Sequence, residues 1–238
     1  MTIHAIICTR TAETVSQTTD KLFQFLVSCG IEITVMSGAK SIFNAYQGAF
    51  DRLNPADDDI CIFCHDDIEL RENPVEFVNK LKAACSLPET GFVGAAGTTH
   101  LSENAVWWNQ DLWRQGKHKG KVWHIQTEPG MLNDLKIIEY LTTYGPPDDV
   151  VALDGLFLAA RADVIRKIGL QKPEYFEGEW DFYDIHYTTK AFKEGYTNKV
   201  MDLNILHNSR GELVGRDSWH KNRAAFIANN ELPMKIEE

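Results

Sequence analysis

The chain has 238 residues, a hydrophobic content of 44% and a formal net charge of −10 at pH 7. These values allow one large or two small domains with a substantial core. They argue against non-specific nucleic-acid binding as the main activity, because such binding depends on Lys and Arg contacts to phosphates. No apolar run reaches the roughly 18 residues of a membrane span, and residues 1–13 lack the basic and apolar regions of a secretory signal, so we expect neither.

The five cysteines are odd in number and lack the spacing of a disulfide framework. This usage predicts reduced thiols and a cytoplasmic location. Cys61 and Cys64 have the spacing of a metal-binding or redox pair. However, both lie in an apolar segment that we expect to be a strand, where positions three apart point to opposite faces. We therefore predict that they are core cysteines.

Short apolar runs alternate with segments of helical periodicity over residues 1–100. Gly30 is a natural helix end, and Asn73 followed by Pro74 is a natural helix start. The expected order is strand 3–9, helix to Gly30, strand 31–35, helix 41–53, strand 60–64, helix from Asn73 and strand 91–97. This alternation predicts an α/β fold with a mostly parallel central sheet and helices on both faces.

Polar groups follow two of these predicted strands. A Thr-Arg-Thr segment occupies positions 9–11, and His65, Asp66 and Asp67 follow the apolar run 60–64. Solvated carboxylates are common in surface loops, which is one explanation. In parallel sheets, however, ligands bind outside the carboxyl ends of the strands. The second group therefore marks a candidate binding site.

The alternating pattern stops over residues 98–150. Only 121–126 has the character of a strand in this region, and 142–149 is a turn-rich loop. Residues 106–126 contain four tryptophans and a basic group. We expect this part of the chain to be an inserted, aromatic-rich loop region.

Two explanations for these tryptophans stay open. Trp107, Trp108 and their neighbours could fill a small satellite core. Alternatively, the insertion binds substrate, because aromatic faces suit sugar rings, lysines suit phosphates and loops often carry function. The basic residues are Arg114, Lys117, Lys119 and Lys121.

Regular periodicity returns after about residue 150. The apolar run 150–161 is strand-like but is interrupted by Asp154 and Gly155. Further expected elements are a short helix 162–169, a helix from Asp184 to Gly195, a strand 200–209 that carries His207, and a final helix 217–230. A carboxylate in the first turn of a helix is favoured by the helix dipole, so Asp184 has an explanation without function. We expect a single domain with a loose tail from about residue 228.

Four stretches, in this order, resemble family-2-like glycosyltransferases with the GT-A fold, over roughly residues 3–215. The stretches are ICIFCHDDIEL, LDGLFLAARADVIRKIG, FEGEWDFYDIHYTTKAFKEGY and ILHNSRG. They resemble the family's Asp-X-Asp-type motif, the segment before its acceptor site, its Glu-Asp helix start and a late strand whose histidine often joins a metal site. The chain departs from this pattern at His65, which replaces the first Asp, and at Tyr183, which replaces the Glu. It also lacks the acidic residue that many relatives have after the second strand.

The resemblance implies transfer of a sugar from a nucleoside-diphosphate sugar to a hydroxyl acceptor, with inversion. Mn²⁺ or Mg²⁺ would neutralise the diphosphate leaving group, with Asp67 and His207 as candidate ligands. Asp184 is the candidate base, with Asp181 and Glu179 as rivals. The nucleotide would be bound by Thr9, Arg10, His65 and Asp66, with a surface ion pair as the alternative for Arg10. Asp154 would line the acceptor pocket, together with Trp107 and Trp108 if the insertion binds substrate.

The resemblance also implies a division of the single domain. The nucleotide-binding half would cover about residues 1–100 and the acceptor half about 101–227, with the tail at about 228–238. It suggests a role in bacterial surface-polysaccharide biosynthesis in the cytoplasm, with room for peripheral membrane contact. The donor nucleotide and the oligomeric state are not indicated.

Three other functions are alternatives. A metal phosphohydrolase uses His-Asp pairs, but these usually lie on helices with further histidines nearby. A non-catalytic nucleotide-sugar-binding protein of the same fold would explain the two departures from the family motifs. A nucleotidyltransferase would normally have a Gly-rich and basic loop after the first strand, and CTRTAETVS has no glycine.

Overall fold

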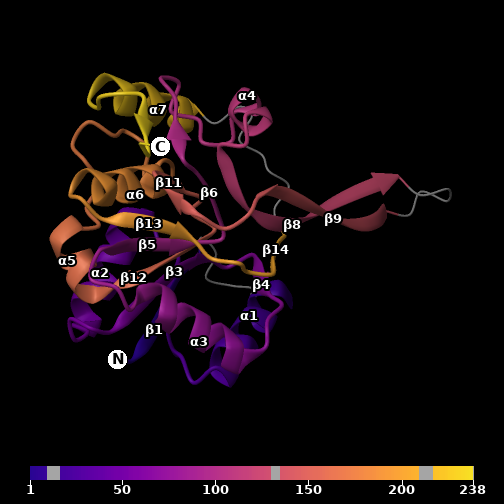
Figure 1. Ribbon diagram of the computed structural model, residues 1–238. Coiled ribbons are helices and arrows are strands. Elements are labelled where there is room, and N and C mark those ends of the chain that lie inside the picture. The colour runs from indigo at the N-terminus through magenta and orange to yellow at the C-terminus, as the bar shows by residue number, and fades with distance from the viewer. Residues whose placement is uncertain (10–16, 130–134, 209–216, 238) are drawn as a thin grey trace.

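A seven-stranded sheet forms the centre of the computed structural model, which describes residues 1–9, 17–129, 135–208 and 217–237 (Figure 1). In spatial order the strands are β10 (Asp149–Val150), β13 (Thr197–Val200), β5 (Thr90–Gly94), β12 (Phe157–Arg161), β3 (Ile60–His65), β1 (Ile3–Thr9) and β2 (Glu32–Ser37). β12 and β10 run antiparallel to their neighbours, and the other strands share one direction. The expected α/β fold with a mostly parallel central sheet is confirmed.

Helices cover both faces of this sheet, as the alternating pattern predicts. They are α1 (Gln17–Ser28), α2 (Ile42–Leu53), α3 (Pro74–Cys85), α5 (Ala162–Ile168) and α6 (Tyr183–Lys193). Phe77 of α3 contacts Phe157 of β12, whereas Tyr46 of α2 packs on Phe63 of β3. Phe63 pairs with Leu158, the neighbour of Phe157, and successive strand residues point to opposite faces. The two helices therefore lie on opposite sides of the sheet.

The start of α3 illustrates how the local sequence sets an element boundary. The Asn73 side chain accepts hydrogen bonds from the backbone N–H groups of Val75 and Glu76, at 3.0 and 3.2 Å. These donors have no partner inside the helix, and Pro74 lacks an N–H at the first helical position. The predicted helix start is thus observed at the predicted residues.

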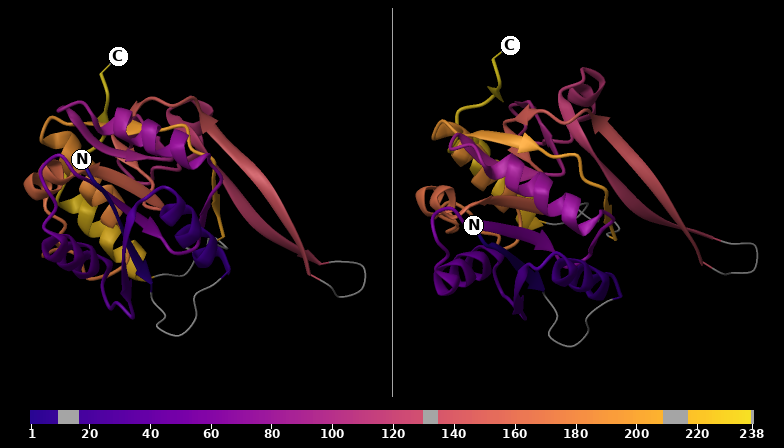
Figure 2. Two further views of the ribbon diagram at one scale, coloured as in Figure 1. Left: turned by 90° about the horizontal axis from the view of Figure 1, so that it is seen from below. Right: turned by 60° about the horizontal axis from the view of Figure 1, so that its bottom comes forward.

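A second sheet adjoins the first and contains most of the inserted region. Its strands are β11 (Ala152–Leu153), β6 (Ala96–Thr98), β8 (His118–Pro129), β14 (Ile205–His207) and β4 (Ile68–Leu70), with β9 (Leu135–Gly145) paired to β8. β8 and β9 form a long hairpin that projects from the body of the protein (Figures 1 and 2). A short helix, α4 (Gln110–Arg114), precedes it. The region 98–150 is therefore more regular than its sequence indicates.

Two predicted strands are divided between the sheets. The apolar run 150–161 becomes β10, β11 and β12, with a break at Asp154 and Gly155. The predicted strand 200–209 is wrong in its limits, because Val200 ends β13 in the central sheet and Ile205 begins β14 in the second sheet. This crossing carries the chain to the neighbourhood of β4 and β8.

The C-terminal segment is held in place by a strand pair. After α7 (Asp217–Ala228), β15 (Met234–Lys235) pairs antiparallel with β7 (His100–Leu101), and the Met234 side chain is buried. The expectation of a loose tail from about residue 228 is therefore wrong for this pair of residues. A short strand of two residues has too little periodicity to be recognised in sequence.

All five cysteines lie in the described part of the chain, and none of them forms a disulfide bond. Cys61 and Cys64 are buried in β3, as predicted for core residues. Among the residues with described positions, no helix has the length and apolar character that a bilayer crossing requires.

Candidate functional site

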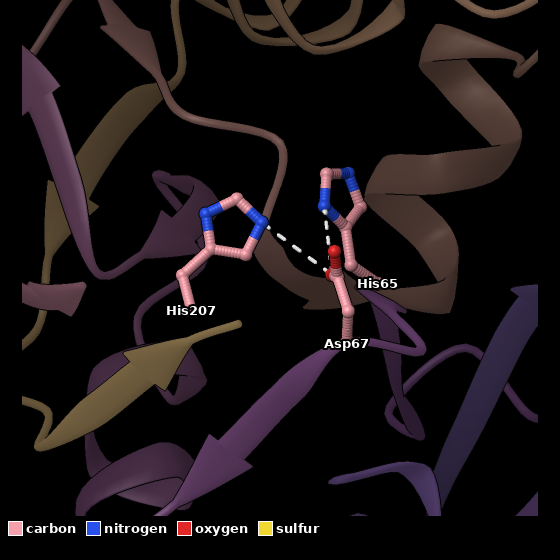
Figure 3. A group of neighbouring side chains, drawn as sticks. All are labelled: His65, Asp67 and His207. Atoms are coloured by element: carbon pink, nitrogen blue, oxygen red, sulfur yellow. Dashed lines mark ion pairs between the residues drawn. The ribbon is translucent and has the colours of Figure 1, made fainter. Parts of the chain in front are cut away.

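Three side chains from separate strand ends converge beside the central sheet (Figure 3). His65 ends β3, Asp67 lies in the turn before β4, and His207 ends β14. The Asp67 Oδ1 atom is 3.6 Å from His65 Nδ1 and 3.4 Å from His207 Nε2. One potential ligand atom from each residue lies within 4.8 Å of the other two. This geometry brings both predicted metal ligands together and adds His65, which we had expected to contact the nucleotide.

Strand register places His207 next to Asp67. β14 pairs antiparallel with β4, so that His207 stands opposite Ile68. The Asn208 backbone N–H donates a hydrogen bond to the Asp67 carbonyl at 2.8 Å. β14 also pairs in parallel with β8 on its other side. The second sheet therefore positions the imidazole from both edges of its strand.

The cluster has the electrostatics of an ion pair between Asp67 and His207. Within the described residues, Asp67 Oδ1 and His207 Nε2 are buried and have no hydrogen-bond partner of ordinary geometry. Burial would raise the pKa of Asp67, but His207 and His65 outweigh it and lower that pKa. Burial would likewise lower the pKa of His207, but Asp67 and then Asp154 raise it.

A bound divalent cation would satisfy the orphaned donor atoms of this cluster. One carboxylate and two imidazoles are a mixed oxygen and nitrogen set, which suits Mn²⁺ better than Mg²⁺. The residues present thus fit a divalent metal, and the fit rests on their chemistry and burial.

A series of hydrogen bonds connects this cluster to the start of α6. His65 Nε2 lies 2.9 Å from the Tyr183 hydroxyl, which donates to the Gly155 carbonyl at 2.8 Å. The Gly155 N–H in turn donates to Asp184 Oδ2 at 3.0 Å. A Cβ at position 155 would lie 2.4 Å from the Tyr183 hydroxyl oxygen and 2.9 Å from the Asp184 Cβ, so only glycine permits this approach.

Asp184 has the electrostatic environment of a proton acceptor that works near neutral pH. Burial, and then the neighbouring charge of Asp154, raise its pKa to about 7. Burial also raises the pKa of Asp154, against the Leu156 N–H and the charges of His207 and His124. A carboxyl group whose pKa is raised by burial and by a second carboxyl group is typical of functional sites, although structural networks produce the same effect.

The rival carboxylates make other contacts. The Asp181 side chain is buried and accepts a hydrogen bond from Ser218 Oγ of α7 at 2.6 Å. The Glu179 carboxylate is bonded to Lys172 and lies close to Ser41. Of the three candidate bases, Asp184 is the one whose carboxylate is hydrogen-bonded to Gly155, and Gly155 connects it through Tyr183 to His65.

Thr9 and Asp66, which are also predicted to bind the nucleotide, lie near strand ends. Thr9 ends β1, and its carbonyl accepts a hydrogen bond from the Ala39 N–H at 3.4 Å. The Asp66 carbonyl accepts from Thr19 Oγ1 at 2.7 Å. Arg10 lies outside the described residues.

Comparisons with known proteins agree with this arrangement. The sequence profile of the glycosyltransferase-like family matches residues 5–229. The chain belongs to this family. The matched residues include the hairpin and the three residues of the cluster.

One relative of this glycosyltransferase-like chain and one solved structure of similar fold add detail. The streptomycin biosynthesis protein StrF of Streptomyces griseus is 27% identical over 199 residues, and the match covers 81% of this chain and 62% of StrF. The chain therefore spans about three fifths of the length of that curated relative. The crystal structure of GalNAc-T7 with UDP, GalNAc and Mn²⁺ matches with a TM-score of 0.53 at 12% identity, over 94% of this chain and 48% of GalNAc-T7. This likeness shows the GT-A-type fold.

The tryptophans of this glycosyltransferase-like chain have different environments. Trp107 is 2% exposed and packs against Trp108, His118 and Tyr144. Trp108 is 37% exposed, and its other face lies against Trp219. Trp107 is therefore a core residue, within the same hydrophobic core as the strands of the central sheet rather than a separate satellite core, whereas part of the Trp108 ring is exposed.

The basic residues of the insertion include three that form ion pairs with nearby aspartates. Arg114, Lys119 and Lys121 pair with Asp111, Asp148 and Asp202, respectively. These contacts explain part of the basic group without a phosphate ligand. Lys117 is exposed to an intermediate degree, and its backbone carbonyl accepts from Thr99 N–H.

The two tryptophans allow a matched comparison. We expect Trp107→Ala to lower the free energy of unfolding by about 3–5 kcal/mol, because a large buried ring leaves a cavity. We expect Trp108→Ala to lower the free energy of unfolding by clearly less, because part of that ring is already exposed to water. Urea denaturation of both variants measures the difference, and equal losses would contradict the assignment of Trp108 to the surface.

Sequence reasoning missed two members of the site. Tyr183 was recognised only as a departure from the family's Glu-Asp pair, and its contact with His65 is not visible in sequence. His124 of β8 has its ring centre 6.4 Å from that of His207 and stacks on Tyr140. The pairing of β8 with β14 creates this proximity, and no local pattern signals it.

Proposed function

We propose that the chain transfers a sugar from a nucleoside-diphosphate sugar to a hydroxyl group of a glycan or other acceptor, with a divalent cation as cofactor. The observation that carries the proposal is the convergence of His65, Asp67 and His207 at the carboxyl end of β3. Membership of the glycosyltransferase-like family and the Mn²⁺ and UDP present with GalNAc-T7 support the same chemistry.

In this proposal, Asp67, His207 and His65 hold the cation. When bound, a divalent cation supplies positive charge that stabilises the developing diphosphate leaving group. Asp67 contributes the negative charge of the set, and the two imidazoles contribute nitrogen donors. We propose Mn²⁺ as the metal because two nitrogen ligands favour it over Mg²⁺.

Asp184 is the proposed base. The attacking hydroxyl must lose a proton, and a carboxylate with a pKa of about 7 is well matched to that task near neutral pH. Direct attack by the activated hydroxyl on the anomeric carbon inverts its configuration. Asp154 and Trp108 are proposed to line the acceptor side, and Thr9 and Asp66 the nucleotide side.

The proposed setting is the cytoplasm. None of the five cysteines forms a disulfide bond, which is the usual state in a reducing compartment. A nucleoside-diphosphate sugar donor is in keeping with that setting.

A thermal-shift screen of nucleoside diphosphates, with and without Mn²⁺, tests the binding part of the proposal. A ligand that binds only the native state at a hundredfold excess over its Kd raises stability by about 2.7 kcal/mol. We expect at least one nucleoside diphosphate to stabilise the protein, and to do so more strongly with Mn²⁺. No stabilisation by any of them would contradict the proposal.

Turnover separates an enzyme from a binding protein of the same fold. With the nucleotide identified, hydrolysis or transfer of the labelled donor is measured with Mn²⁺ and with a chelator. We expect metal-dependent release of nucleoside diphosphate. Tight binding without release or transfer would support the non-catalytic alternative.

The two predicted ligands should differ in how much they contribute to Mn²⁺ affinity. We expect His207→Ala to weaken Mn²⁺ binding less than Asp67→Ala does, because an imidazole carries no negative charge and water or phosphate can take its place. Mn²⁺ titrations followed by electron paramagnetic resonance measure both variants, with His220→Ala as a control for loss of an exposed imidazole on α7. An unchanged titration in His207→Ala would make that residue structural.

A further inference from the structure

The contact between His65 and Tyr183 has a fixed direction. Tyr183 is 5% exposed, and its hydroxyl has one proton, which it donates to the Gly155 carbonyl. A carbonyl oxygen can only accept, so the proton is committed there. The 2.9 Å contact with His65 Nε2 therefore requires the imidazole to donate its Nε2–H to the tyrosine oxygen.

This direction determines the tautomer of the neutral imidazole. With the proton on Nε2, the lone pair of His65 is on Nδ1. Nδ1 is the atom that lies 3.6 Å from Asp67 Oδ1, inside the three-residue cluster. The ring therefore turns its donor side to Tyr183 and its acceptor side to the cation site.

The tyrosine itself is held rigidly. Its ring lies against Tyr46, Tyr187 and Phe43, with ring centres 5.9, 6.0 and 6.4 Å away. These rings come from α2 and α6, on the face of the sheet that carries the start of α6. Because the ring cannot turn without disturbing this packing, its hydroxyl is a stable reference point for the imidazole.

We propose that Tyr183 is a positioning residue of the metal site: it holds His65 in the Nε2–H tautomer, so that Nδ1 faces a divalent cation shared with Asp67 and His207. The inference rests on the proposed function for the identity of the site. A hydrogen bond to the second nitrogen of a ligating histidine fixes its orientation, and loss of such a bond typically costs about 10–100-fold in metal affinity.

The arrangement also links the metal site to the proposed base. Gly155 accepts from Tyr183 through its carbonyl and donates to Asp184 through its N–H. One residue thus connects the hydroxyl that orients His65 with the carboxylate that would accept a proton. The Gly155 backbone thus links the residue that orients a proposed metal ligand to the proposed base.

A double-mutant cycle tests the inference through Mn²⁺ affinity. We expect Tyr183→Phe to weaken Mn²⁺ binding by about 10–100-fold, as for other outer-sphere partners of a metal ligand. In a His65→Ala background the same substitution should have almost no further effect, because the imidazole that it orients is gone. An equal loss in both backgrounds would overturn the inference.

A neighbouring tyrosine provides the matched control. Tyr187 packs in the same aromatic group, and its hydroxyl donates to the Leu170 carbonyl at 2.6 Å, away from the cluster. Tyr187→Phe removes the same atom from the same environment and should leave Mn²⁺ affinity unchanged. If it weakens binding as much as Tyr183→Phe, the effect reflects loosened packing and the inference fails.

A second measurement does not require metal. Nitrogen-15 chemical shifts of His65, recorded on metal-free protein at a pH where imidazole is neutral, distinguish the two tautomers. We expect the Nε2–H form in the parent and a mixture in Tyr183→Phe. A predominantly Nδ1–H form in the parent would overturn the inference. If instead the parent shows Nε2–H but binds no Mn²⁺, the metal part of the proposed function fails and the tautomer assignment stands.

Discussion

Replacing Asp67 with alanine is expected to abolish Mn²⁺-dependent binding of nucleoside diphosphate and to leave the fold intact. Asp67 is the single carboxylate in the cluster and lies between the two imidazoles. Outer-sphere partners of metal ligands typically contribute about 10–100-fold to affinity, so loss of the charged ligand itself should exceed this range. The fold should survive because the hydrogen bond from the Asn208 N–H goes to the Asp67 backbone carbonyl, which alanine retains.

Asp66 is the matched control for this variant. It is the adjacent carboxylate, it is absent from the cluster, and we propose that it faces the nucleotide. Asp66→Ala should change nucleotide affinity by a similar factor with and without Mn²⁺, whereas Asp67→Ala should lose only the increment that Mn²⁺ provides. Calorimetric titration of nucleoside diphosphate under both conditions makes the comparison. Equal Mn²⁺-dependent affinity in Asp67→Ala and the parent would disprove the assignment of Asp67.

The location of the site could be predicted because strand ends are a local property. Apolar runs and helix signals identify β1 and β3, and the polar residues after them follow directly. The set of residues that forms the cluster could not be predicted in the same way, because His65 lies close to His207 only through the pairing of β14 with β4 and β8. Registers between strands far apart in the sequence depend on tertiary packing, which a single sequence does not display.

The hairpin escaped prediction for a related reason. A strand is recognised when one of its faces is buried along its length. In β8 and β9 the burial changes from the base of the hairpin outwards: Val122 is buried, whereas Ile137, Tyr140 and Leu141 are exposed. Apolar and polar residues therefore follow no single period, and only the stretch 121–126, near the body, has the pattern of a strand.

The three carboxylates at positions 179, 181 and 184 are close in sequence and distinct in space. Phe182, at the start of α6, has a left-handed backbone with φ of 68°, which turns the chain between two of them. Asp181 is directed to Ser218 of α7, and Asp184 to the Gly155 N–H. A left-handed non-glycine residue has no reliable sequence signal, so the different directions of these side chains could not be predicted from the sequence.

The last expected result concerns Asp184→Asn, for which we expect transfer to fall by roughly 10²–10⁴ at saturating donor and acceptor, the usual contribution of a positioned base. Asparagine keeps the size of the side chain and an oxygen that can accept from the Gly155 N–H, but it cannot take a proton. Donor binding should be unchanged, because the cluster that would hold the cation and diphosphate is formed by other residues. A role limited to the helix start predicts almost no effect, since asparagine is also favourable there.

The pH dependence gives Asp184→Asn a second readout. The base acts in its ionised form, so parental turnover should rise with pH through about 7 and then level off, and the variant should lose this rise. The free energy of unfolding should change with pH in the opposite direction to turnover. The folded-state pKa is raised above the usual value of 3.8, so the stability that the protonated carboxyl contributes is complete below pH 4 and is lost as pH rises through about 7. Asparagine does not ionise, so the variant should gain stability relative to the parent across that window. Near-parental turnover in Asp184→Asn would move the role to Asp181 or Glu179, and if Asp181→Asn and Glu179→Gln were also without effect, all three carboxylates would be excluded as the base.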